Sequence, residues 1–161
     1  MRDRISFENT SHERGAVPAA GDTAHATNVL SRRPHVLVVE DHDAVREVIV
    51  RTLHKISVAT IEAMSAEEAR MRFSASWLDA AIVDVALPGG NGLDLGEWMR
   101  RRLPMLPIIY ISGLSEQEMP GPLPRDNLSR FIRKPFGARV IIDFVTNLLA
   151  QTAGHADLSS L

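Results

Sequence analysis

The chain has 161 residues, of which 45% are hydrophobic and 24% are charged, and this composition suits one globular domain with additional segments. It contains no cysteine, which excludes a disulfide scaffold, a cysteine-based zinc site and thiol catalysis. A net charge of −2 argues against a chain-wide polyanion binder, and an aromatic fraction of 5% disfavours a stacking platform for single-stranded nucleic acid. No apolar run approaches the roughly 18 residues of a membrane span, so we expect a cytoplasmic protein without membrane contact.

The two ends of the chain differ from its middle. Residues 1–33 mix charged and small polar side chains without a period of 2 or 3.6, and we predict a flexible N-terminal extension there. No apolar core follows the basic start, so a secretory signal is not expected. Residues 151–161 are also small and polar, and we predict a flexible C-terminal tail. The folded domain is expected over 34–150.

Within that domain, apolar β-branched runs alternate with amphipathic segments. In chain order we expect strand 36–39, helix 44–53, strand 58–63, helix 66–73, strand 80–83, helix 93–102, strand 108–111, strand 130–132 and helix 140–149. We expect Asp43 to act as the N-terminal cap of the first helix. The alternation predicts an α/β fold with a doubly wound parallel sheet covered on both faces. In such folds the working site lies beyond the carboxyl ends of the strands.

Charged and hydroxyl side chains follow four of the five predicted strands. Glu40 and Asp41 follow the first strand, Asp84 the third, Ser112 the fourth and Lys134 the fifth. Carboxylates gathered at one sheet edge repel each other, so the cluster requires a cation. Oxygen ligands without cysteine or a histidine pair select a hard ion, and Mg²⁺ is the expected one. A carboxylate beside Mg²⁺ and a lysine can act as a nucleophile toward a phosphoryl group.

These residues lie in four short motifs in fixed order: residues 38–41, residues 82–84 followed by Pro88 and Gly92, residues 111–113 and residues 133–136. The motif set resembles that of response regulator receiver domains, the CheY-like superfamily, and it covers about residues 34–150. Only about a dozen residues follow Leu149, and a DNA-binding effector domain needs more. We therefore expect the stand-alone, single-domain type of receiver, with no direct DNA binding.

The resemblance implies a flavodoxin-like sheet of five parallel strands in the order 2-1-3-4-5, flanked by helices. It implies that Asp84 accepts a phosphoryl group from a histidine kinase, hybrid kinases included, or from a histidine phosphotransfer protein. Asp41 and Asp84 would bind Mg²⁺ directly, Glu40 through a water molecule, and Ala86 through its backbone carbonyl. Such a protein is not an enzyme with an external substrate, because it catalyses only its own Mg²⁺-dependent phosphorylation and dephosphorylation.

The resemblance assigns further roles at the fourth and fifth strands. Ser112 and Lys134 would bind phosphoryl oxygens, and Ser112 and Phe131 would form the switch that transmits phosphorylation. The Lys134–Pro135 peptide bond would be cis, as is usual in the family. The signal would leave through a downstream target protein or by onward phosphotransfer within a two-component phosphorelay, and the sequence does not separate these two outputs.

The region of the family's fourth helix departs from the pattern. Residues 115–127 contain Pro120, Pro122 and Pro124, which forbid a regular helix, so at most one turn from Ser115 to Met119 is expected. A short, proline-rich segment of this kind is similar to that of receivers serving hybrid histidine kinases. The shortening argues against an obligate dimer through the face that the family builds from its fourth helix, fifth strand and fifth helix.

Particular residues of the chain oppose other functions. A receiver-like adaptor that works without phosphorylation has the same fold, but the complete acidic site argues against it. A haloacid-dehalogenase-type phosphatase needs an aspartate two residues after its nucleophile, where this chain has Ala86. A flavodoxin-like nucleotide binder needs a phosphate loop after the first strand, where this chain has Glu40 and Asp41. His42 suggests a transition-metal ligand, but without a second histidine at ligand spacing we interpret it as an exposed loop residue.

Overall fold

The computed structural model describes residues 32–73 and 78–158. The extension predicted over 1–33 therefore lies almost entirely outside the described residues. The elements in chain order are β1 (His35–Val39), α2 (Asp43–Lys55), β2 (Ala59–Ala63), α3 (Ala66–Arg72), β3 (Ala80–Asp84), α4 (Gly92–Arg100), β4 (Ile108–Ser112), the 3₁₀ helix η1 (Glu116–Glu118), β5 (Ser129–Arg133) and α5 (Ala138–Leu158).

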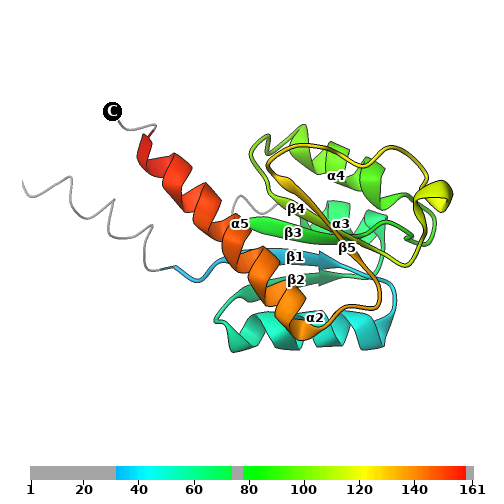
Figure 1. The fold of residues 1–161 in the computed structure, drawn as a ribbon, viewed down its shortest axis with the longest axis horizontal. Helices are drawn as coiled ribbons and strands as arrows, with labels where there is room; N and C mark the ends of the chain where they lie inside the picture. The colour runs from blue at the N-terminus through cyan, green and yellow to red at the C-terminus, as the bar shows by residue number, and fades with distance from the viewer. Residues whose placement is uncertain (1–31, 74–77, 159–161) are drawn as a thin grey trace, which may run out of the picture. The chain divides into compact units, whose positions relative to one another are not determined.

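The five strands form one parallel sheet in the order β2-β1-β3-β4-β5, which confirms the predicted fold class. Because all strands run the same way, their carboxyl ends lie along one edge of the sheet, at the right in Figure 1. β3 lies between β1 and β4, and β5 follows at the outer side of β4. Residues that end β1, β3, β4 and β5 are thus placed next to each other.

Helices cover both faces of the sheet (Figure 1). On one face, α2 and α5 pack against every second residue of the strands, such as Val36, Val38 and Ile82. On the other face, α3 and α4 pack against the intervening residues such as Leu37 and Val83. Burial on both faces explains the continuous apolar runs of the sequence, since alternate residues of each strand enter different cores.

The start of α2 differs from the prediction. His42 occupies the N-terminal cap position, with no side-chain cap hydrogen bond, and Asp43 is the first residue of the helix. The predicted capping role of Asp43 is therefore wrong. Its carboxylate instead accepts a hydrogen bond from Arg46 one turn later, at 2.5 Å, which places an acid in the first helical turn where the helix dipole favours it.

The segment between β4 and β5 forms a single 3₁₀ turn, Glu116–Glu118, and then runs without regular structure to β5. The Glu118 carboxylate accepts hydrogen bonds from the Ser115 amide at 2.9 Å and from the Ser115 hydroxyl at 2.7 Å. The prolines that follow cannot donate backbone hydrogen bonds, so the helix stops. The predicted shortening of the fourth helix is confirmed.

The last helix is longer than predicted. We expected helix only to residue 149 and a flexible tail over 151–161, but α5 continues to Leu158. The tail prediction is wrong for residues 151–158. No proline interrupts this stretch, and adding residues to a helix that is already formed costs far less than starting one. None of the helices in the described ranges has both the length and the apolar character that a membrane crossing requires.

Candidate functional site

The carboxyl edge of the sheet brings together the residues that the sequence placed at the strand ends. Glu40 directly follows β1, Asp84 ends β3, Ser112 ends β4, and Lys134 directly follows β5. The Lys134 amide donates a hydrogen bond to the Ser112 carbonyl at 2.8 Å, which extends the pairing of β4 and β5 to the site. The Lys134–Pro135 peptide bond is cis, as the resemblance implies.

Lys134 holds two carboxylates. Its Nζ lies 2.7 Å from Glu40 Oε2 and 2.6 Å from Asp84 Oδ2. Both acids are buried, with Glu40 0% exposed and Asp84 3% exposed. Isolated buried carboxylates would be strongly unfavourable, so the ammonium group is the charge that allows them to lie side by side.

Burial and neighbouring charges shift the pKa values of Glu40 and Lys134. Loss of solvent raises the pKa of Glu40 above its ordinary value, the nearby Asp84 charge raises it further, and the contact with Lys134 only partly offsets this. Burial acts to lower the pKa of Lys134, but the contacts with Asp84 and Glu40 outweigh it and leave the pKa raised. Lys134 therefore stays protonated at neutral pH, and a proton is more easily bound at Glu40 than at an exposed glutamate.

Asp41 and His42 complete the cluster on its open side. The Asp41 side chain is about a quarter exposed, and the His42 ring is mostly exposed. His42 Nδ1 lies 2.9 Å from Asp41 Oδ1 and 3.4 Å from Glu40 Oε1. One ligand atom each from Glu40, Asp41, His42 and Asp84 lies within 4.8 Å of the others. His42 is exposed as expected, and its ring nitrogen also lies beside the acids.

The donor set fits a divalent cation. Three carboxylates against one ammonium leave two negative charges at the site, which is the charge that one divalent ion would balance. Asp41 is accessible to solvent, whereas Glu40 and Asp84 lie behind it, so an ion would keep water on one side, as Mg²⁺ usually does. Receiver domains hold Mg²⁺ through an acidic site of this kind.

Ala86 contacts Asp84 directly, and Ser112 ends the neighbouring strand β4. The Ala86 amide donates a hydrogen bond to Asp84 Oδ1 at 2.9 Å, and residue 86 is exposed beyond the strand. Ser112 is fully buried, and its Oγ accepts a hydrogen bond from the Leu114 amide at 3.0 Å. The Ser112 hydroxyl proton is not used by that bond and can be donated to another acceptor.

Phe131 lies on β5 beside Tyr110 of β4. Its side chain is partly buried and packs against the core formed under α3 and α4. An aromatic ring at the margin of a core can exchange one packing position for another without unfolding the strand that bears it.

Gly92 begins α4 directly behind the acidic site. A Cβ atom at this position would lie 2.0 Å from the backbone oxygen of Asp84 and 2.8 Å from Val85 Cα. The Gly92 amide also donates to the Val85 carbonyl at 3.0 Å. Only glycine permits this approach, and it fixes the backbone on which the Asp84 side chain stands.

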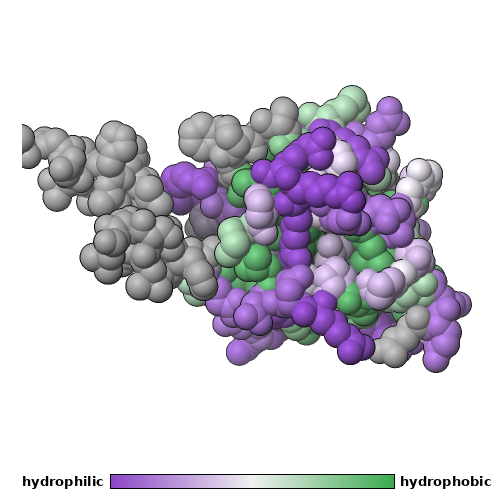
Figure 2. Space-filling view, turned by 90° about the horizontal axis from the view of Figure 1, so that it is seen from above, coloured by the Kyte–Doolittle hydropathy of each residue, from purple (hydrophilic) through white to green (hydrophobic). Residues whose placement is uncertain are grey.

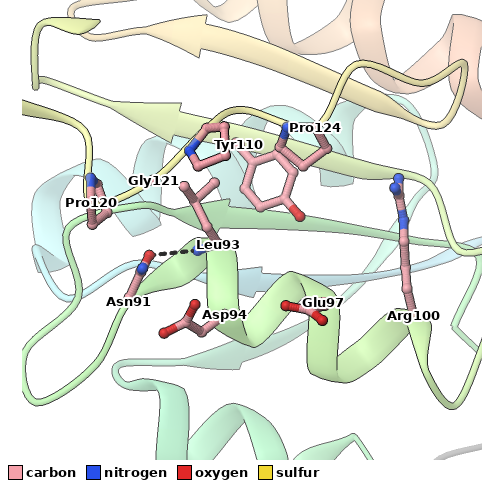
Figure 3. A pocket seen from close by; sticks show the side chains of 10 residues that line it. Asn91, Leu93, Asp94, Glu97, Arg100, Tyr110, Pro120, Gly121 and Pro124 are labelled. Atoms are coloured by element: carbon pink, nitrogen blue, oxygen red, sulfur yellow. Dashed lines mark hydrogen bonds between the residues drawn. The ribbon is translucent and has the colours of Figure 1, made fainter. Parts of the chain in front are cut away.

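A pocket that none of the acidic-site residues lines lies between α4 and the proline-rich segment (Figure 3). Its volume is about 490 Å³. The ring of Tyr110 and the prolines of the segment form one wall, and the carboxylates of Asp94 and Glu97 come from α4 (Figure 3). Viewed from above, the side on which α4 lies in Figure 1, the surface is mainly hydrophilic and apolar side chains show only in small areas (Figure 2).

Comparisons with known proteins agree with this geometry. The sequence profile of the response regulator receiver domain matches residues 36–146. The chain belongs to the response regulator receiver domain family. It is 34% identical over 124 residues to the sensor kinase CckA of Brucella abortus, covering 76% of this chain and 13% of that protein. It is 31% identical over 123 residues to the response regulator protein FleR of Pseudomonas aeruginosa, covering 76% of this chain and 26% of that protein.

Solved structures show the same fold. The receiver domain of the hybrid histidine kinase CckA superposes with a TM-score of 0.61 at 32% identity, covering 71% of this chain and 98% of that one. A CheY-like receiver domain from Methanospirillum hungatei superposes with a TM-score of 0.67 at 18% identity, covering 77% and 99%. The chain thus corresponds to whole receiver domains, but it spans only 13% and 26% of the two curated relatives named above.

Proposed function

We propose that this chain is a phosphoacceptor receiver of a two-component phosphorelay, and that Asp84 takes the phosphoryl group. The observation that carries this proposal is the position of Asp84. It is the central acid of the cluster, its Oδ2 contacts Lys134 and its Oδ1 accepts the Ala86 amide. The receiver domain is proposed to extend over 34–150.

The proposed reaction is a transfer between two side chains. A carboxylate oxygen of Asp84 forms a bond to phosphorus while the bond from phosphorus to the donor's histidine nitrogen breaks, and the electron pair stays on that nitrogen. Lys134 lies beside the attacking carboxylate and compensates charge on the phosphoryl oxygens, and the Ser112 hydroxyl can donate to one of them. The chain catalyses only this uptake and the later hydrolysis, so it is not an enzyme with an external substrate.

The metal ion of the site is proposed to be Mg²⁺. Asp41 and Asp84 would bind it directly, Glu40 through water, and Ala86 through its carbonyl. When bound, the ion neutralises charge on the phosphoryl oxygens. Glu40 is buried against Lys134, and Asp41 is the more accessible acid, which suits these different roles.

Ser112 and Phe131 are proposed to pass the change on. A phosphoryl oxygen on Asp84 would accept a hydrogen bond from the Ser112 hydroxyl and draw it closer. Ser112 ends β4 beside β5, and β5 carries Phe131. Phe131 has no hydroxyl that could bond outward, so the switch would work through burial of its ring alone. The change would reach the surface near η1 and β5, at the shortened fourth helix.

The proposed donor is a histidine kinase, hybrid kinases included, or a histidine phosphotransfer protein. The sensor kinase CckA and the response regulator protein FleR are both relatives, so the likeness fits a kinase-attached receiver and a separate regulator alike. The output is proposed to be binding to a target protein or onward phosphotransfer, without direct DNA binding. Because a histidine kinase draws on ATP, the proposed place of action is the cytoplasm.

The test is phosphorylation in vitro. The purified protein is incubated with acetyl phosphate and Mg²⁺, and its intact mass is measured beside that of Asp84→Asn and of the parent in EDTA. We expect one added phosphoryl group in the parent with Mg²⁺ and none in the variant or without the metal. A phosphoryl adduct on Asp84→Asn would show that another residue accepts the phosphoryl group.

The alternative function is a receiver-like adaptor that binds its partner without phosphorylation. No adduct in the parent with acetyl phosphate, and none with a panel of histidine kinases, would favour it. Turnover of many phosphate esters per protein would contradict both functions and favour a phosphatase.

A further inference from the structure

His42 is anchored next to the acidic cluster by its backbone. Its amide donates a hydrogen bond to Glu40 Oε1 at 3.2 Å, and its carbonyl accepts the first backbone hydrogen bond of α2, from Arg46, at 3.0 Å. The start of the helix therefore holds residue 42 in a fixed position beside two carboxylates. Its imidazole adds a nitrogen donor to a site that is otherwise made of oxygen atoms.

The distances around the ring match those between ligands of a single ion. Two ligand atoms about 2.1 Å from an octahedral ion lie roughly 3 Å apart when adjacent and roughly 4.2 Å apart when opposite. His42 Nδ1 lies 2.9 Å from Asp41 Oδ1 and 3.4 Å from Glu40 Oε1. The four candidate ligand atoms, one from each residue, lie within 4.8 Å of one another. A small contraction around an ion would bring Asp41, His42 and Asp84 into one coordination sphere, with Glu40 close enough to reach the ion through a water molecule.

We propose that His42 binds the divalent ion of the acidic site directly through Nδ1. The inference rests on the proposed function only in that both use this acidic site. An imidazole ligand favours ions such as Ni²⁺ and Zn²⁺, whereas Mg²⁺ prefers oxygen ligands and water. The site therefore discriminates between Ni²⁺ and Mg²⁺ more strongly than a site built from the three carboxylates alone.

A simple hydrogen bond between His42 and Asp41 is the competing explanation. It would also produce the 2.9 Å contact, but it would leave the imidazole outside the coordination sphere when an ion occupies the site. The two explanations differ in whether a nitrogen atom touches the bound metal, and that can be measured without any phosphoryl donor.

The experiment uses the full chain, the His42→Ala variant and a His54→Ala control. His54 is also exposed and lies in the last turn of α2, where its Nε2 contacts Thr60 Oγ1 at 3.0 Å, away from the acids. Each protein is loaded with Mn²⁺, and pulsed electron paramagnetic resonance measures coupling of the ion to nitrogen. Calorimetric titrations with Mg²⁺, and with Ni²⁺ displaced by excess Mg²⁺, give the affinity ratio of the two ions at the shared site.

We expect nitrogen coupling in the parent and in His54→Ala, and its loss in His42→Ala. The ratio of Ni²⁺ to Mg²⁺ affinity should fall by at least about tenfold in His42→Ala, because loss of even an outer partner of a metal ligand commonly costs this much. A parent that binds Mn²⁺ without nitrogen coupling, or an unchanged ratio in His42→Ala, would overturn the inference and leave the proposed phosphorylation standing. A folded parent that binds no divalent ion would overturn both the inference and the proposed Mg²⁺ site.

Discussion

Lys134 Nζ lies 2.6 Å from Asp84 Oδ2, joining residues that are 50 positions apart in the chain. The same nitrogen lies 2.7 Å from Glu40 Oε2. One ammonium group therefore neutralises two buried acids, and it ties the end of β3 to the loop after β5. This arrangement links the chemistry of the site to the stability of the fold.

Removal of that ammonium group should destabilise the metal-free protein. In Lys134→Ala the two carboxylates face each other without a cation, and the free energy of unfolding at pH 7 in EDTA should fall by about 1–3 kcal/mol. Urea denaturation measures it. Lys134→Arg keeps the charge and should lose less. Equal losses in both variants would show that the shape of the lysine matters and its charge does not.

The same variant should separate uptake of the phosphoryl group from its transmission. Lys134→Ala should still accept phosphate from acetyl phosphate, but slowly. Phosphorylation should shift the amide resonance of Phe131 in the parent and not in the variant, which two-dimensional NMR measures. If phosphorylation shifts the Phe131 resonance of Lys134→Ala as much as that of the parent, Lys134 has no part in the switch.

Gly92 should tolerate no side chain. In Gly92→Ala the new Cβ would lie 2.0 Å from the Asp84 carbonyl oxygen, and a backbone atom at the end of a central strand cannot move away freely. We expect a loss of about 1–3 kcal/mol or more in stability and a reduced yield of the phosphoryl adduct. Gly137→Ala is the matched control, since nothing lies within 4 Å of its Cβ position. A stable, fully phosphorylated Gly92→Ala protein would contradict the geometry.

Gly96 and Tyr110 should behave as a coupled pair. A Cβ at position 96 would lie 2.0 Å from Tyr110 Oη and 2.8 Å from its Cζ, and the tyrosine is buried. Gly96→Ala should therefore destabilise by about 1–3 kcal/mol, although the same change in a free helix stabilises. Tyr110→Phe removes Oη and should recover part of the loss in the double variant. Strict additivity in thermal denaturation would exclude a direct clash.

Asp126 should stabilise the protein in a pH-dependent way. Burial acts to raise its pKa, but hydrogen bonds from Arg100 and from the Leu128 amide outweigh this and leave the pKa below the ordinary value of 3.8. A depressed carboxyl pKa stabilises the fold above the unfolded value, and this contribution is lost as pH falls through the folded value.

Asp126→Asn should therefore unfold more easily at pH 7, by at most about 1 kcal/mol because the side chain is substantially exposed. The difference in the free energy of unfolding between Asp126→Asn and the parent should begin to narrow below pH 3.8. Urea denaturation across pH 3–7 measures it, and the Arg100→Gln background should diminish the effect. A difference that does not change with pH would mean that the charge of Asp126 contributes nothing.

Local patterns in the sequence predict most of the helices and strands and the polarity of the site. Runs such as 36–39 and 108–111 are apolar because each strand is covered on both faces, and that requirement can be read from neighbouring residues alone. Parallel strands then place whatever follows them at one edge, so Glu40, Asp84 and Lys134 were expected together. The three prolines after η1 excluded a long fourth helix for an equally local reason.

Contacts between residues far apart in the chain follow from the tertiary structure alone. The contacts of Lys134 with Glu40 and Asp84 require β1, β3 and β5 to be in place. The prediction of Asp43 as a cap was wrong because the chain between β1 and α2 puts His42 at that position and turns its ring toward the acids.

The cavity between α4 and the proline-rich segment likewise has no counterpart in any local pattern. The net charge of the chain is only −2, yet its sequence places acids at the strand ends. Only the fold set the distances between them, because distances across a sheet edge are set by strand order and packing rather than by position along the chain.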